Sequence, residues 1–147
     1  MSIRSATVKD IPALSELIVR SIRVLNANEH TSDALELVCA LFSEKRLNRD
    51  LLRRDMFVLE DEGLLIGTIS LGGGMLHSLF VDPIQACKGH GRLLVNHIER
   101  YARIKHLEKL SLRSSLTAVP FYQKLGYVKL SEVKVDFGST WAMEKTL

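Results

Sequence analysis

The stretch MLHSLFVDPIQACKGHGRLL, residues 75–94, decides the fold, because a strand, a glycine-containing loop and the start of a helix follow one another in it. Met75–Val81 is an apolar run typical of a strand, and Asp82-Pro83 ends it. Gly89–His106 has the pattern of an amphipathic helix, whose apolar face we expect to contain Leu93, Leu94, Ile98, Tyr101 and Ala102. With Leu107–Arg113 as the next strand, these segments form a βαβ unit, whose crossover connection predicts that the two strands run parallel.

Further strands lie on both sides of this unit. Met56–Glu60 and Leu64–Leu71 are β-rich runs, and Asp61-Glu62-Gly63 between them indicates a hairpin. The remaining strands are expected at Ile3–Ala6 and, as a terminal antiparallel pair, at Tyr127–Val135 and Trp141–Leu147. The sequence therefore predicts one mixed α/β domain over residues 1–147, with a central sheet flanked by helices.

The other helices are placed by their caps and apolar stripes. Asp10 is the expected N-cap of a helix that ends near Asn26, and Thr117 that of a short helix through Leu125, which Gly126 closes. Another helix begins at Thr31 or Ser32, and its expected apolar stripe is Ala34, Leu37, Val38, Leu41 and Phe42. Residues 44–55 are dominated by charge and predict a short helix or loop with little to bury.

Composition indicates an ordinary globular chain. Of its 147 residues, 46% are hydrophobic and 25% are charged, which excludes a disordered or collagen-like protein. The net charge of +3 is too small to indicate a nucleic-acid binder. Residues 82–132, however, contain nine basic and four acidic residues, whereas the rest of the chain carries −2. This uneven distribution predicts either an anionic ligand on one part of the fold or a solvated basic helix face.

Neither a metal site nor export is indicated. Cys39 and Cys87 lie 48 positions apart, without C-x-x-C or a histidine at metal-ligand spacing. The first ten residues lack an apolar signal region, and no apolar run approaches 18 residues. We therefore expect no metal, no membrane partner and a cytoplasmic location.

The loop Gln85–Arg92 is the strongest candidate for ligand binding. Gly89 and Gly91 allow close backbone approach, and the unpaired N–H groups at the helix start can hold a phosphate or pyrophosphate. Lys88 and Arg92 add positive charge. Helix-entry glycines in any βα turn look the same, however. The loop is neither a P-loop nor a dinucleotide fingerprint, because G-x-x-x-x-G-K-[ST] and a third glycine are absent.

Three ordered motifs together resemble a known family. They are Leu79-Phe80-Val81-Asp82-Pro83, Lys88-Gly89-His90-Gly91-Arg92-Leu93-Leu94 and Ala118-Val119-Pro120-Phe121-Tyr122-Gln123-Lys124-Leu125-Gly126-Tyr127. This set is similar to the acetyl-CoA-binding core of the GNAT superfamily of N-acetyltransferases, across roughly residues 56–147. The resemblance implies that strands 75–81 and 107–113 splay apart and that acetyl-CoA lies between them. One departure is that Ala86 stands where the family usually has Gln or Arg, with Gln85 one residue early.

The resemblance also implies a cofactor site. Backbone groups around Leu79, Phe80 and Val81 would pair with the pantetheine arm, and a backbone N–H near Leu79 would donate to the thioester carbonyl. The loop would hold the pyrophosphate. The residues expected to hold acetyl-CoA are Leu79, Phe80, Val81, Cys87, Lys88, Gly89, His90, Gly91, Arg92, Thr117 and Tyr122. Cys87 is either a reactive thiol beside Lys88 or a bystander.

Tyr122 is the candidate catalytic acid. A phenol of pKa ~10 can stabilise or protonate a thiolate whose conjugate thiol has a pKa of ~8.5, and the matching tyrosine of the family has this role. Alternatively, Tyr122 only packs beside Phe121, which we expect in the core together with Tyr127. Trp141 is expected to anchor the final strand in the core, although an edge position would place it in the substrate cleft or a dimer contact.

The base that deprotonates the amine is less clearly marked. Some family members have a glutamate at the position of Met75, which cannot act as a base. His77, with an unperturbed pKa of ~6.5, is the candidate base, on the same strand face as Met75 and Leu79 by alternation. There are three alternatives. His77 has only a structural role, Glu60 or Glu62 is the base, or the amine loses its proton through water.

The sequence thus predicts an acetyl-CoA-dependent N-acetyltransferase that acts on a primary amine by direct attack in a ternary complex. Its rivals are a non-catalytic acyl-CoA-binding module, favoured by Met75, and a basic nucleic-acid-binding domain, which lacks a binding motif. The acceptor is a small molecule or peptide, and the charges of Glu29, Asp33 and Glu36 against Arg20 and Arg23 select no class. A homodimer and an acyl group other than acetyl remain open.

Overall fold

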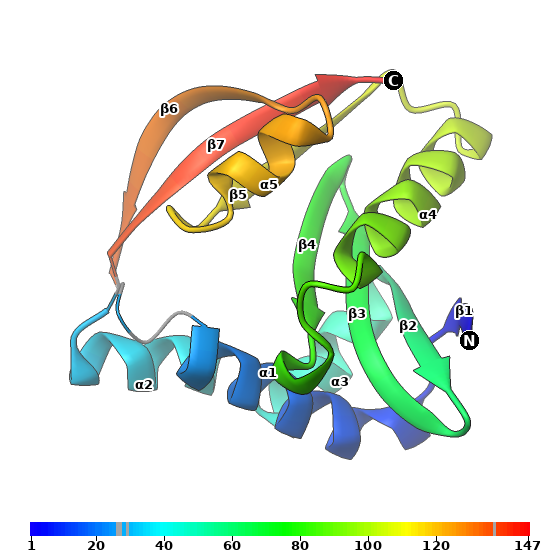
Figure 1. The fold of residues 1–147 in the computed structure, drawn as a ribbon, viewed down its shortest axis with the longest axis vertical. Coiled ribbons are helices and arrows are strands. Elements are labelled where there is room, and N and C mark those ends of the chain that lie inside the picture. Colours follow the sequence, from blue (N-terminus) through cyan, green and yellow to red (C-terminus); the bar gives the residue numbers. More distant parts are fainter. Residues whose placement is uncertain (26–27, 29, 137) are drawn as a thin grey trace.

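The computed structural model describes residues 1–25, 28, 30–136 and 138–147, and a seven-stranded sheet runs through it (Figure 1). In spatial order the strands are β1 (Ser2–Ser5), β2 (Asp55–Asp61), β3 (Leu64–Gly72), β4 (Met75–Val81), β5 (Lys109–Ser114), β7 (Gly138–Thr146) and β6 (Val128–Val135). β4 and β5 are parallel, and every other neighbouring pair is antiparallel. The predicted mixed fold, the hairpin and the crossover are therefore confirmed.

Helices cover both faces of the sheet and define two cores. The helices are α1 (Ile11–Leu25), α2 (Ser32–Ala40), α3 (Glu44–Arg53), α4 (His90–Ile104) and α5 (Val119–Lys124), with short 3-10 turns at Val8–Asp10 and Pro83–Gln85. In β2, Phe57 and Leu59 pack in the core that includes α4, whereas Met56 and Val58 pack in the core of α1 and α3. Because both faces are covered, Met56–Leu59 is apolar at every position, without the alternation of a half-exposed strand.

The sheet divides between β4 and β5. Their register contains a single pair, Met75 with Ser111, and Ser111 N donates to Gly74 O at 3.1 Å. Figure 1 shows the two strands diverging from this point, with α1 and α2 beyond the open end. The predicted splay of strands 75–81 and 107–113 is thus present.

Several local predictions need correction at helix starts. Thr7 is the N-cap of the 3-10 turn Val8–Asp10 that leads into α1, and Asp10, the last residue of this turn, accepts from Thr7 N at 2.8 Å and from Arg4. α5 begins at Val119 with Ala118 as its N-cap, and Ser115 Oγ accepts from Ala118 N, so Thr117 does not cap it. Of the two predicted starts of α2, Thr31 or Ser32, Thr31 is the N-cap. The predicted end of α1, Asn26, and the charged Glu29 lie outside the described residues.

Two apolar stripes also differ from expectation. Leu37 and Leu93 are 53% and 46% exposed. The buried positions on their helices are Cys39 in α2 and His90, Leu94, Val95, Ile98, Glu99 and Ala102 in α4. Residues 44–55 form the regular helix α3 and the start of β2, and α3 buries Leu47. No helix among the described residues is long and apolar enough to cross a membrane.

Candidate active site

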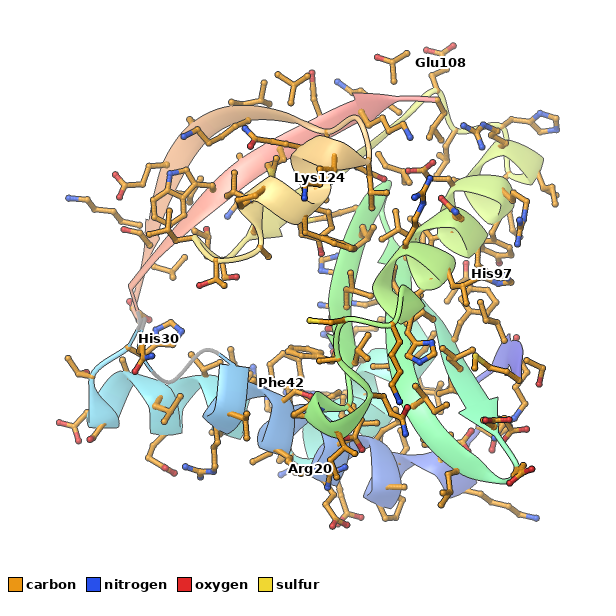
Figure 2. The ribbon with its side chains drawn as sticks, in the orientation of Figure 1. Arg20, His30, Phe42, His97, Glu108 and Lys124 are labelled. Carbon is orange, nitrogen blue, oxygen red and sulfur yellow. The ribbon has the colours of Figure 1, made fainter. Side chains whose placement is uncertain are left out.

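A cavity of about 1060 Å³ opens where β4 and β5 separate. Its walls come from α1, α2, α3, β4, β5, α5 and β7. His30 and Phe42, which line it, lie on the α2 side of the opening, across from α5, which carries Lys124 (Figure 2). A Cβ added to Gly138 would lie 3.6 Å from His30 Nδ1, so the start of β7 closes against the region before α2. The cavity is therefore bounded by segments far apart in the sequence.

A bulge in β4 shapes the cavity wall. Ser70 pairs with His77 and Thr68 with Phe80, which leaves Ser78 and Leu79 opposite Ile69 alone. Ser78 has a φ of +54°, a left-handed conformation unusual for a non-glycine residue. The extra residue resets the alternation of side chains along the strand.

This reset corrects one prediction. Leu76 and Leu79 both pack in the core of α4, so His77, the neighbour of Leu76, faces the opposite side from Leu79. His77, Leu79 and Phe80 all border the cavity. Val81 does not line it, and its carbonyl accepts a hydrogen bond from Ser21 Oγ at 3.0 Å.

The loop before α4 has the geometry of an anion site. Gly89, the N-cap, has a φ of +82°, and Cys87 a φ of +62°. The first intrahelical bond runs from Leu93 N to Gly89 O, so the N–H groups of residues 90–92 have no helical partner. These groups stand at the positive end of a 15-residue helix. The loop therefore fits a pyrophosphate through its backbone.

Side chains around the loop add detail. Gln85 accepts from Lys88 Nζ at 3.2 Å, and Cys87, Lys88 and Arg92 are exposed. His90, expected in the loop, is instead the buried first residue of α4. A Cβ added to Gly91 would lie 3.1 Å from Phe121 Cζ. Glycine at this position thus lets α5 pack closely against the start of α4.

Tyr122 lies on α5 at the cavity and is 6% exposed. Its ring packs edge-on against Phe121 at 5.1 Å and Tyr127 at 5.8 Å between centroids. Burial raises the pKa of Tyr122 well above the usual value for tyrosine, so its hydroxyl stays protonated. Within the described part of the chain this hydroxyl has no hydrogen-bond partner. Tyr122 therefore has a proton available to a group in the cavity.

Tyr127 lies deeper and has a structural role. Its hydroxyl donates to Glu99 Oε2 at 2.9 Å, and Lys145 Nζ lies 2.9 Å from Glu99 Oε1. Burial and the Glu99 carboxylate raise the pKa of Tyr127. Because Glu99 is on α4 and Lys145 on β7, this buried group joins the two halves of the split sheet.

His77 is the candidate base that reaches the cavity. It is half-buried, and burial, followed by the positive charge of Arg54, lowers its pKa below 6.5. The neutral imidazole, which accepts a proton, therefore predominates at pH 7. Glu60 accepts from Arg4 at 3.1 Å and Glu62 lies in the β2–β3 turn, and neither lines the cavity.

Other predicted residues are distributed unevenly. Thr117 is exposed and does not line the cavity, whereas Trp141 is partly buried and does. Sequence reasoning treated residues 44–55 as a short helix or loop and did not single out their charged side chains as part of the cavity wall. The charged face of α3, and not a loop, borders the site through Arg46, Arg49, Asp50, Arg53 and the C-cap residue Arg54. The regular three- and four-residue spacing of these residues was the available signal.

The family model of the acetyltransferase (GNAT) domain matches residues 26–147, so the chain belongs to the GNAT family of acetyltransferases. It is 24% identical to the uncharacterised N-acetyltransferase YafP of Escherichia coli K12 over 141 aligned residues. The alignment covers 96% of this chain and 90% of that protein. Among solved structures, a GCN5-related N-acetyltransferase from Rhodopseudomonas palustris shares the fold with a TM-score of 0.93 and 23% identity, over 99% of this chain and 95% of that one. PaiA N-acetyltransferase from Thermoplasma acidophilum, solved in complex with coenzyme A, has a TM-score of 0.82 and 21% identity over the full length of both chains.

Proposed function

We propose that this protein transfers an acetyl group from acetyl-CoA to a primary amine by direct attack within a ternary complex. The observation that carries the proposal is the cavity between the diverging strands β4 and β5, which Tyr122 lines and beside which α4 begins. Membership of the GNAT family and the coenzyme A complex of the Thermoplasma relative support it.

The residues of the loop and of β4 fit acetyl-CoA, which when bound supplies an activated acetyl thioester. The free N–H groups of residues 90–92 would bind its pyrophosphate. β4 offers backbone groups along the edge that β5 leaves unpaired beyond Met75. Within the bulge, the backbone N–H of Leu79 would donate to the thioester carbonyl oxygen as negative charge develops there. A donor fixed by the sheet needs no reorganisation during the reaction.

Proton transfer is assigned to two side chains. His77 would accept the proton of the attacking amine, because its pKa lies below the working pH. Tyr122 would donate a hydrogen bond to the departing sulfur and so stabilise the thiolate, because its raised pKa keeps the hydroxyl protonated. The two residues reach the cavity from β4 and from α5. Acid and base would therefore act on separate groups.

Two-substrate initial-rate kinetics test the direct attack. Release of the coenzyme A thiol is followed while acetyl-CoA and an accepted amine are both varied. Intersecting double-reciprocal lines are expected for a ternary complex. Parallel lines together with an acetylated protein would instead show a covalent acetyl-enzyme.

A second candidate is an acyl-CoA-binding module without turnover. Met75, which lines the cavity where some family members have a glutamate, favours it. This candidate predicts that acetyl-CoA binds but that no amine is acetylated.

A further inference from the structure

The α3 wall of the cavity carries a stripe of arginines. Arg46, Arg49 and Arg53 follow one another at three- and four-residue spacing and all line the cavity, so they share one helix face. At 1.5 Å per residue, the stripe is about 10 Å long. Arg113 of β5 borders the same cavity. The wall therefore presents several guanidinium groups to a bound molecule.

These arginines lack ion-pair partners among the described residues. Arg46, Arg49, Arg53 and Arg113 make no ion pair with any residue that the structure describes. Asp50, the acidic side chain among the described residues of the lining, lies 3.9 Å from Arg54.

Three arginines elsewhere in the chain are paired, whereas Arg92, Arg100 and Arg103 of α4 make no ion pair with a described residue. Arg4, Arg20 and Arg23 approach Asp10, Asp82 and Glu36 at 2.8, 2.7 and 2.8 Å. Like charges four residues apart destabilise a helix, so an unpaired stripe has a cost that a bound anion would offset.

The stripe lies away from the expected pyrophosphate site. α3 packs through Leu47 into the core of α1, whereas α4, whose N-terminus fits the pyrophosphate, packs into the core on the other face of the sheet. The cavity lining includes α3 but no residue of α4. The anion that pairs with the arginines is therefore carried by the second substrate.

We infer that the acceptor is a primary amine that also carries a carboxylate or phosphate group, which the α3 arginines bind. This inference rests on the proposed acetyl transfer and names its substrate class. Guanidinium groups suit both anions, because their paired N–H donors match the oxygen atoms of either group. The same positive wall disfavours a protonated amine, so it helps to keep the nucleophile neutral and rejects polyamines.

Matched amines test the inference. The pairs are phosphoethanolamine with ethanolamine and 4-aminobutyrate with butylamine, and spermidine is the polycation. In at least one pair, the amine that carries the anionic group should have a kcat/KM roughly tenfold or more above the partner that lacks it, the effect of one charge-assisted hydrogen bond. The pair with the larger ratio distinguishes phosphate from carboxylate.

The variant R49Q/R53Q separates recognition from chemistry. It should raise KM for the anionic amine roughly tenfold, with kcat and the Kd of acetyl-CoA unchanged. The control R100Q removes an exposed arginine of α4 outside the cavity and should change none of these values.

Three outcomes would overturn the inference: equal use of amines with and without the anionic group, a preference that survives in R49Q/R53Q, or a loss of acetyl-CoA affinity in that variant. Calorimetric titration of the anionic amines into the coenzyme A complex gives a second readout that needs no turnover. Acetylation of no amine at all would refute the proposed function, whereas binding of the anionic amines in that titration would still support the arginine site.

Discussion

Replacing Tyr122 by phenylalanine separates its chemistry from its packing. The ring keeps its contacts with Phe121 and Tyr127, and the hydroxyl has no hydrogen-bond partner among the described residues. Its removal should therefore change the free energy of unfolding by less than about 1 kcal/mol. A positioned general acid contributes at least about 10²-fold, so kcat should fall by that factor, which corresponds to ~2.7 kcal/mol of activation free energy.

Tyr127→Phe is the matched control because it removes the same atom from the neighbouring ring. Here the hydroxyl donates to buried Glu99, which keeps its contact with Lys145. A hydrogen bond to a charged group contributes ~1.5 kcal/mol or more, which lowers Tm by roughly 3–6 °C in a chain of this length. The kcat of Tyr127→Phe should stay near that of the wild type.

The assay is coenzyme A thiol release with saturating acetyl-CoA and amine, paired with thermal unfolding of each protein. Between pH 6 and 9 the ratio of wild-type to Tyr122→Phe rates should stay constant, because the pKa of Tyr122 is raised above its usual value of ~10. Equal kcat values for the wild type and Tyr122→Phe would refute the role of this hydroxyl.

Two further predictions concern the loop and the base. The double variant Gly89→Val/Gly91→Val should abolish measurable acetyl-CoA binding in calorimetry, because Gly89 needs a φ of +82° and Gly91 lies against α5. The control Gly63→Val, at the same φ in the β2–β3 turn, should retain binding. Unchanged affinity in the double variant would exclude the loop as the pyrophosphate site. The pKa of His77 in the folded protein is lowered below 6.5, so kcat/KM should decline only as the pH falls below 6.5. The contribution of His77 to folding stability is present above pH 6.5 and should also be lost as the pH falls below it. His77→Gln should lower kcat/KM and remove the acidic limb, and a limb that persists in the variant would assign it to another group.

The strands and their order around the split could be predicted because their signals are local and strong. Met75–Val81 appears as β4 with the predicted bounds, and the crossover through α4 sets it parallel to β5. The bulge could not be predicted in the same way. Ser78 adopts a positive φ without being glycine, so the sequence carries no mark of it, and strict alternation put His77 and Leu79 on one face.

The charged wall of the cavity was missed for a different reason. A sum of charges along the sequence placed the positive surplus in residues 82–132, whereas the arginines that face the cavity lie mainly on α3. In residues 44–55, the positive charges are partly cancelled in such a sum by the acidic residues Glu44, Asp50 and Asp55. Leu47 and Leu51 pack this helix against the core, and only this packing shows which charges face the site. Charge becomes informative once it is summed over a surface in space.

The most direct test measures acetyl-CoA binding and turnover on the same preparation of the wild-type protein. Acetyl-CoA is titrated calorimetrically, and thiol release and acetylated amine are then quantified with primary amines that carry an anionic group, primary amines without one, and a polyamine. The account predicts binding, and for at least one amine the formation of one acetylated product per thiol released. Binding of acetyl-CoA without acetylation of any amine would contradict it and would identify the protein as a binding module.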